Sequence, residues 1–255
     1  MGSARIAERL FRGAGCIKCS SFAGIREDHA AMSDQVLPPL FIDRPARSST
    51  GLTAEQANQL THALGFAICT VAATTLVLRA ISIGGPVRIL GCLIYGGTMV
   101  ALYAASTLSH SFADPQRRQF YRMLDQVCIL LFTAGSFTPF AVLHLTSPIG
   151  WVLLAIMWLA ALVGCWKRVA QPEKTICPWT IVPLGWVPAL ALYRIFEVGG
   201  WGGLATVLAG GFAYSGGVWF LMNDNRHRYF HAVWHLLTIT GTMLHFGFIF
   251  GCVAA

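Results

Sequence analysis

The sequence predicts an all-α integral membrane protein, built as a bundle of about seven transmembrane helices. Hydrophobic residues make up 55% of the 255 residues and charged residues only 11%, and the mean hydropathy is +0.60. Soluble domains usually carry about a quarter charged residues, so this composition indicates that a lipid bilayer surrounds most of the chain. After Gln56, long apolar runs alternate with short polar pieces, as repeated crossings of about 20 residues require.

The first 54 residues differ from the rest and are predicted to form a polar, flexible cytoplasmic tail that precedes a membrane domain at 55–255. They mix seven basic with five acidic residues and lack a continuous apolar run. A cleaved secretory signal is not expected, because such a signal needs an uninterrupted apolar core. Translation could instead begin at Met32, which would give a shorter protein. Cys16 and Cys19 form a lone Cys-x-x-Cys, which without a second pair does not favour a metal site.

The apolar segments of the membrane domain give the expected helices in order. They lie at 57–79, 86–108, 124–144, 148–166, 178–195, 201–221 and 230–253. Pro183 and Pro188 fall inside the fifth segment and should bend that helix. We expect a multi-pass protein of the cell membrane (plasma or inner membrane).

The orientation of the bundle follows from its basic residues. Arginine and lysine are concentrated in the tail and in the connections after the second, fourth and sixth helices, with Arg117, Arg122, Arg168 and Arg226 among them. These four regions share one side, which the positive-inside rule makes cytoplasmic, so the C-terminus is expected outside. The net charge of +7 therefore needs no nucleic-acid partner, because it is largely the charge that orients the inner face, to which anionic lipid could contribute.

Five polar residues are predicted to meet at the cytoplasmic boundary of the bundle. Ser106 and His110 end the second helix, Asp125 opens the third, and His231 and His235 open the seventh. Polar groups in a membrane are costly and usually serve a function or find a partner. Their common depth favours one shared site.

The histidine spacing is typical of a metal site. His231 and His235 are four residues apart, so both imidazoles project from one helix face, about 6 Å apart along the axis. With His110 they would give Zn²⁺ three ligands and leave a fourth position for water, as in catalytic zinc sites. Asp125 could orient or deprotonate that water, and Ser106 could donate to a reacting carbonyl. The alternatives are interfacial histidines, a serine bonded within its own helix and an aspartate paired with Arg122.

Several motifs resemble the hemolysin III family, which is related to the progestin and adipoQ receptors. They include Tyr103-Ala-Ala-Ser-Thr-Leu-Ser-His110, Leu124-Asp125 and Phe230-His-Ala-Val-Trp-His235. The resemblance implies a seven-helix fold with an inner-facing zinc held by His110, His231 and His235, and with Asp125 and Ser106 beside it. Gln126 departs from the pattern, because many members carry a histidine there.

Two further histidines have less defined expectations. His245 lies ten residues beyond His235, about 15 Å further along the same helix, so one ion cannot join them and packing or a hydrogen bond is expected. His62 begins the first helix and could support the site from behind or lie at the interface.

Three functions are compatible with these features. A zinc-dependent hydrolase of a lipid amide or ester, similar to ceramidases, would use the open metal position. A receptor or sensor would carry structural zinc. A pore-forming cytolysin is disfavoured, because the helices carry few internal charges and no polar stripe. The sequence indicates no oligomeric state.

Overall fold

The computed structural model describes residues 52–253, and all regular structure within that range is helical. The tail prediction for residues 1–51, including Cys16, Cys19 and Met32, lies outside the described residues. The elements are α2 (Ala54–Ile83), α3 (Pro86–Ser109), α4 (Pro115–His144), α5 (Pro148–Ala170), α6 (Ile181–Trp186), α7 (Leu192–Met222) and α8 (Phe230–Cys252), with short 3₁₀ turns η1 (Pro178–Thr180), η2 (Val187–Ala191) and η3 (Asp224–Arg226).

Local capping chemistry sets where the long helices begin. Thr53 forms a capping box with Gln56, in which the Thr53 hydroxyl accepts from the Gln56 backbone N–H at 3.2 Å. Asp114 caps α4 by accepting from the Arg117 N–H at 2.9 Å. Proline stands in the first turn of α3, α4 and α5, where its missing N–H costs nothing.

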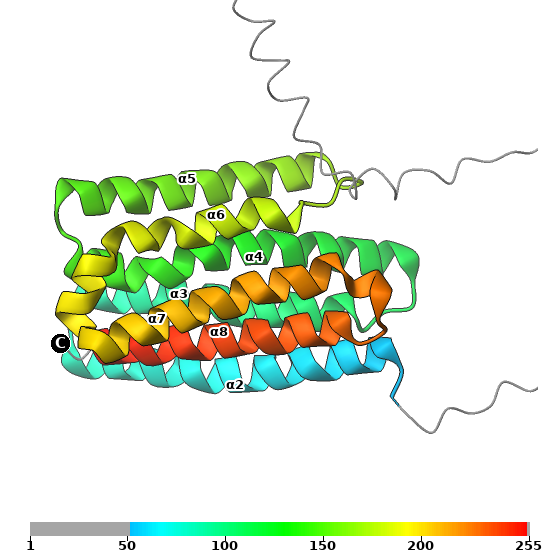
Figure 1. Cartoon of the computed structure of the whole chain (residues 1–255), viewed down its shortest axis with the longest axis horizontal. Helices are drawn as coiled ribbons and strands as arrows, with labels where there is room; N and C mark the ends of the chain where they lie inside the picture. The colour runs from blue at the N-terminus through cyan, green and yellow to red at the C-terminus, as the bar shows by residue number, and fades with distance from the viewer. Residues whose placement is uncertain (1–51, 254–255) are drawn as a thin grey trace, which may run out of the picture. The chain divides into compact units, whose positions relative to one another are not determined.

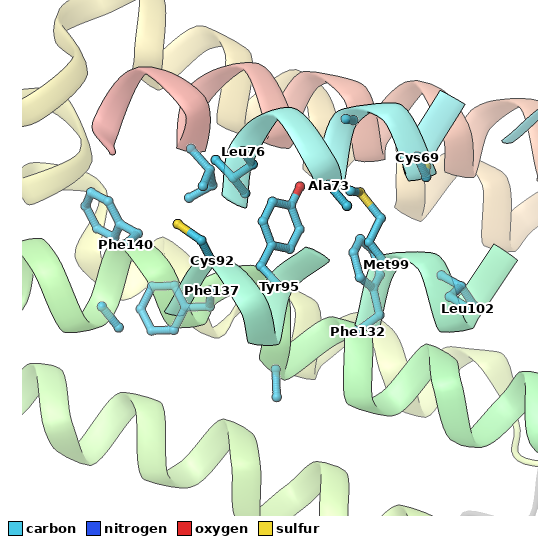
Figure 2. Packing of buried hydrophobic residues seen from close by; sticks show 14 of the residues in the cluster. Cys69, Ala73, Leu76, Cys92, Tyr95, Met99, Leu102, Phe132, Phe137 and Phe140 are labelled. Atoms are coloured by element: carbon cyan, nitrogen blue, oxygen red, sulfur yellow. The ribbon is translucent and has the colours of Figure 1, made fainter. Parts of the chain in front are cut away.

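The long helices lie side by side and place one end of α2, α3, α4 and α8 together (Figure 1). Helix α3 packs between α2 and α4, α8 packs against α7 and α2, and α5 packs on α4. The interior between α2, α3 and α4 holds fully buried Tyr95, Met99 and Leu76 with Phe132 and Phe137 (Figure 2). This packing fixes the ends of α2 and α3 that carry the polar residues.

Six helices in the described range are long and apolar enough to cross a membrane. Many large apolar side chains point outward, including Leu64 and Val71 of α2 and Val152 and Leu159 of α5. In water these faces would be unfavourable, but hydrocarbon is their natural surrounding.

The fifth of these spans, Pro178–Met222, is 45 residues long and irregular. Pro188 lies in η2, which confirms the expected distortion at this proline. Gly200 has φ 58° and ψ −161°, a non-helical conformation inside α7 that glycine adopts readily. The expected break between 195 and 201 is therefore present, although no separate helix ends at residue 195.

One predicted boundary was wrong. The third helix was expected to begin at residue 124, with Asp125 in its first turn, but α4 begins at Pro115. Hydropathy predicts a loop for the charged stretch before Asp125. However, the Asp114 cap and Pro115 begin the helix within this charged stretch, before the apolar segment starts. Asp125 thus lies ten residues inside α4, held on both sides by helical backbone.

Candidate metal centre

His110 stands where α3 ends and is directed into the bundle. It is the C-cap residue of α3, and its backbone N–H donates to the Thr107 carbonyl at 3.3 Å. Its side chain is almost completely buried. The end of α3 therefore places the His110 imidazole against the neighbouring helices and not on the surface of the bundle.

His231 and His235 face His110 from the first two turns of α8. Their ring centroids are 4.6 Å apart, and each lies 5.2 Å from the ring of His110. One ligand atom from each of the three residues lies within 4.8 Å of the others. After small side-chain rotations, three nitrogen atoms this close can share one ion with bonds of about 2.0–2.1 Å. The predicted convergence of these three histidines is confirmed.

The Nδ1 atom of each of the three rings lies within hydrogen-bond distance of an oxygen atom. Nδ1 of His110 lies 3.3 Å from Oε1 of Glu55, and Nδ1 of His231 lies 3.3 Å from Oδ2 of Asp224. Nδ1 of His235 lies 3.2 Å from the Asn58 carbonyl, with the Thr61 hydroxyl at 3.0 Å.

These partners fix the tautomer of all three rings. Carboxylate and carbonyl oxygens only accept hydrogen bonds, so each Nδ1 carries the proton and donates it. The lone pair is then on Nε2 of every ring, which is the arrangement that metal-binding histidines usually show. The donor set fits a divalent ion such as Zn²⁺.

The charge state of His110 agrees with metal binding. Burial, and after it the neighbouring His231 ring, lower the pKa of His110 to about 4, although the Glu55 carboxylate acts in the opposite direction. The imidazole is therefore neutral at pH 7, and no proton competes with a metal for its lone pair.

Ser106 and Asp125 form a second polar pair beside this group. Ser106 lies one turn before His110 on α3, is buried, and lies beside the Asp125 carboxylate of α4. Oδ1 of Asp125 is inaccessible and has no hydrogen-bond partner among the described residues. Asp125 is not one of the residues whose ligand atoms lie within 4.8 Å of one another.

Gln126, which departs from the family pattern, forms hydrogen bonds outside the histidine group. Its Oε1 accepts from Arg168 Nε at 2.5 Å and from the Ile176 N–H at 3.3 Å. It thereby joins α4 to the end of α5 and the following loop, while the adjacent Asp125 faces Ser106.

Of the polar residues on this part of α2, only His62 was given a possible supporting role from the sequence, whereas Glu55, Asn58 and Thr61 were given none. Glu55, Asn58, Thr61 and His62 follow one another at intervals of three, three and one, so they occupy one side of the helix. This periodic polar face in an apolar helix was the available signal. His62 is buried, with its ring centroid 3.6 Å from that of His235, so the interfacial alternative for this residue was wrong.

His245 is separate from the cluster, as expected. Its Nε2 donates to the Val207 carbonyl of α7 at 3.0 Å. Gly210 permits this approach, because a Cβ atom there would lie 2.3 Å from Cδ2 of His245. A hydrogen bond between helices is its structural role.

A largely apolar cavity runs between α4, α6, α7 and α8, with about 1190 Å³ of unfilled space including its open mouth. Three residues of its lining, each on a different helix, are close in sequence to a polar residue of the site. Leu102 lies one turn before Ser106, Ile129 one turn after Asp125, and Trp234 directly before His235. The cavity is thus lined by residues that are close in sequence to the polar residues on α3, α4 and α8.

The chain is similar to one family model and to several known proteins. Residues 50–246 match a family model described as Haemolysin-III related. Hemolysin-3 of Bacillus cereus is 31% identical over 206 residues, covering 80% of this chain and 94% of that protein. A hemolysin-3 homolog of Bacillus subtilis (strain 168) is 30% identical over 202 residues, covering 78% and 94%. The human monocyte to macrophage differentiation factor is 28% identical over 160 residues, covering 60% and 66%.

Proposed function

The chain belongs to the hemolysin III family and is an integral, multi-pass membrane protein, and on that premise we propose that it is a zinc-dependent hydrolase of a lipid amide or ester. The observation that carries the proposal is the group of three imidazoles whose ligand atoms lie within 4.8 Å of one another. Their Nδ1 atoms are all engaged by oxygen acceptors, which leaves three Nε2 lone pairs for one ion.

The residues around the ion have distinct roles. Bound there, Zn²⁺ would supply Lewis-acid activation of water at its open fourth position. His110, His231 and His235 hold the ion. Asp125 takes the proton that the attacking water loses, and Ser106 donates a hydrogen bond that orients the Asp125 carboxylate or the scissile carbonyl.

The adjoining cavity supports a lipid as the substrate. Its lining is mostly aliphatic and aromatic, as an acyl chain requires. Because Leu102, Ile129 and Trp234 lie next to the polar residues, a chain in the cavity would place its polar linkage near the histidines. Binding energy from the chain would thus position the bond that is cleaved.

A second candidate is a receptor or sensor in which zinc is structural. It is favoured by His235, which is 1% exposed and joins α8 to α2 through Asn58 and Thr61. An ion bound there would hold the helix ends together without any chemistry. The two functions differ in what they require of Asp125.

The topology that we propose is a seven-helix bundle with a cytoplasmic N-terminus. A helix of 45 residues would be about 68 Å long, twice the thickness of a bilayer core. The Pro178–Met222 segment is interrupted at η2 and at Gly200, and Figure 1 draws its two halves as adjacent antiparallel rods. Two crossings in this segment raise the total from six to seven.

The location of the C-terminus tests this topology, because an odd number of crossings places the two termini on opposite sides. We expect alkaline phosphatase fused after Ala255 to be active and a fluorescent protein fused there to be dark. The reverse is expected for fusions after Gln171, in the basic connection before η1. Cytoplasmic reporters at both positions would contradict the seventh crossing.

The hydrolase proposal is tested by a substrate screen. Purified protein loaded with zinc should release fatty acid from at least one lipid in a panel of amides and esters, and a chelator should abolish the release. Added zinc should restore it, because the ion is bound reversibly by neutral imidazoles. A fully zinc-loaded protein that leaves the whole panel intact would argue for the receptor.

A further inference from the structure

His62 is a fourth histidine near the three proposed metal ligands, and the proposed function gives it no role. It lies on α2 one turn after Asn58, is 3% exposed, and packs its ring 3.6 Å from the ring of His235, centroid to centroid. Its other aromatic neighbour is Tyr103, with centroids 5.2 Å apart. His62 therefore stands at the same helix junction as the three proposed ligands.

The hydrogen bonding of His62 is exceptional among the histidines in the described range. Neither Nδ1 nor Nε2 of His62 has a hydrogen-bond partner among residues 52–253, and both atoms are inaccessible. The other described histidines each have at least one ring nitrogen within hydrogen-bond distance of a partner, namely His110, His144, His227, His231, His235 and His245.

A second orphan group lies on the same face of α2. The Asn58 backbone carbonyl accepts from His235, yet the Asn58 side-chain Oδ1 is buried without a hydrogen-bond partner in the described part of the chain. A buried polar group that makes no hydrogen bond costs about 1–3 kcal/mol, and phenylalanine or leucine would fill the position of His62 without that cost. His62 and Asn58 therefore form a polar face on α2 whose side-chain atoms are available to hydrogen-bond a further group.

We propose that His62 hydrogen-bonds the exogenous group that occupies the open fourth position of the metal, so that α2 supplies the recognition wall of that position. The proposal rests on the proposed function, because it presumes an ion on the other three histidines. Its ligand class is a small oxygen- or nitrogen-bearing anion, or the polar linkage of a lipid.

His62 is better placed for this contact than for binding the ion itself. The group of ligand atoms within 4.8 Å contains His110, His231 and His235 but not His62. A neutral imidazole offers one donor and one acceptor, and can therefore bind a metal-held group from the side. The contact with His235 keeps the His62 ring beside one of the three proposed ligands.

Azide binding to the Co²⁺-loaded, full-length protein tests the assignment, because azide at the open position changes the visible absorption of Co²⁺. His62→Phe should retain one Co²⁺ per chain and bind azide about 10-fold more weakly, as expected for the loss of one hydrogen bond to a charged group. Tyr103→Phe is the matched control. It removes a neighbouring polar atom whose partner is Thr242, and it should bind azide like the wild type.

The outcomes separate His62 from the hydrolase proposal. Azide affinity in His62→Phe equal to that of the wild type would overturn the role, and so would loss of Co²⁺, which would make His62 a ligand. Weaker azide binding with no hydrolysis of any lipid by the wild type would uphold His62 and refute only the hydrolase. A wild type that binds no Co²⁺ would overturn both.

Discussion

Replacing Asp125 with asparagine should lower lipid hydrolysis by about 10²- to 10⁴-fold, the usual contribution of a general base. The amide has the same shape but cannot take up a proton from the attacking water. Because Asp125 is not in the group of three ligands, the variant should retain its metal and its fold. Fatty acid release and metal content, measured on the same preparation, check both expectations.

Asp114→Asn is the matched control for this prediction. It makes the same chemical change on the same helix, but at the N-cap, where asparagine caps as well as aspartate. Normal hydrolysis in Asp125→Asn would exclude Asp125 as the base. Retained metal and fold together with absent activity in every variant and in the wild type would favour the receptor.

Replacing His235 with alanine should abolish metal binding and lower the melting temperature. The change removes one ligand, the hydrogen bonds to Asn58 and Thr61, and the ring that packs on His62. Truncating a large buried side chain costs about 2–5 kcal/mol, which corresponds to a decrease of about 5–15 °C for a domain of this size. Thermal unfolding in detergent, with and without zinc, measures the effect.

His245→Ala provides the comparison on the same helix. It also removes a histidine that joins two helices, here to Val207, but lies outside the metal group. This variant should be destabilised and still gain stability when zinc is added, as expected for a ligand that binds only the folded state. A zinc-dependent rise in the melting temperature of His235→Ala equal to that of the wild type would contradict its role as a ligand.

The convergence of the three histidines could be predicted from the sequence because much of their geometry is local. His231 and His235 share a helix face by spacing alone, and the basic loops place His110 at the same depth. The acceptors Glu55, Asn58 and Asp224 could not be assigned in this way. Their contacts depend on how α2 and η3 pack against α3 and α8, and hydropathy carries no information about that packing.

The membrane-spanning segments were predictable from apolar length, but their ends were not. Hydropathy marks where a helix becomes apolar, whereas Asp114 and Pro115 mark where α4 begins. The difference matters for Asp125, which is held inside a continuous helix and not at its frayed first turn. A carboxylate held in this way keeps its orientation toward Ser106.

The metal content of the purified protein tests the three-histidine centre most directly. Elemental analysis of the detergent-purified wild type should find about one zinc per chain, and His110→Ala, prepared in parallel, should contain little. His144→Ala, which replaces a histidine bonded to the Cys252 carbonyl, should match the wild type. A well-folded wild type without metal, even after zinc is supplied, would reduce the cluster to packing histidines and contradict the proposed centre.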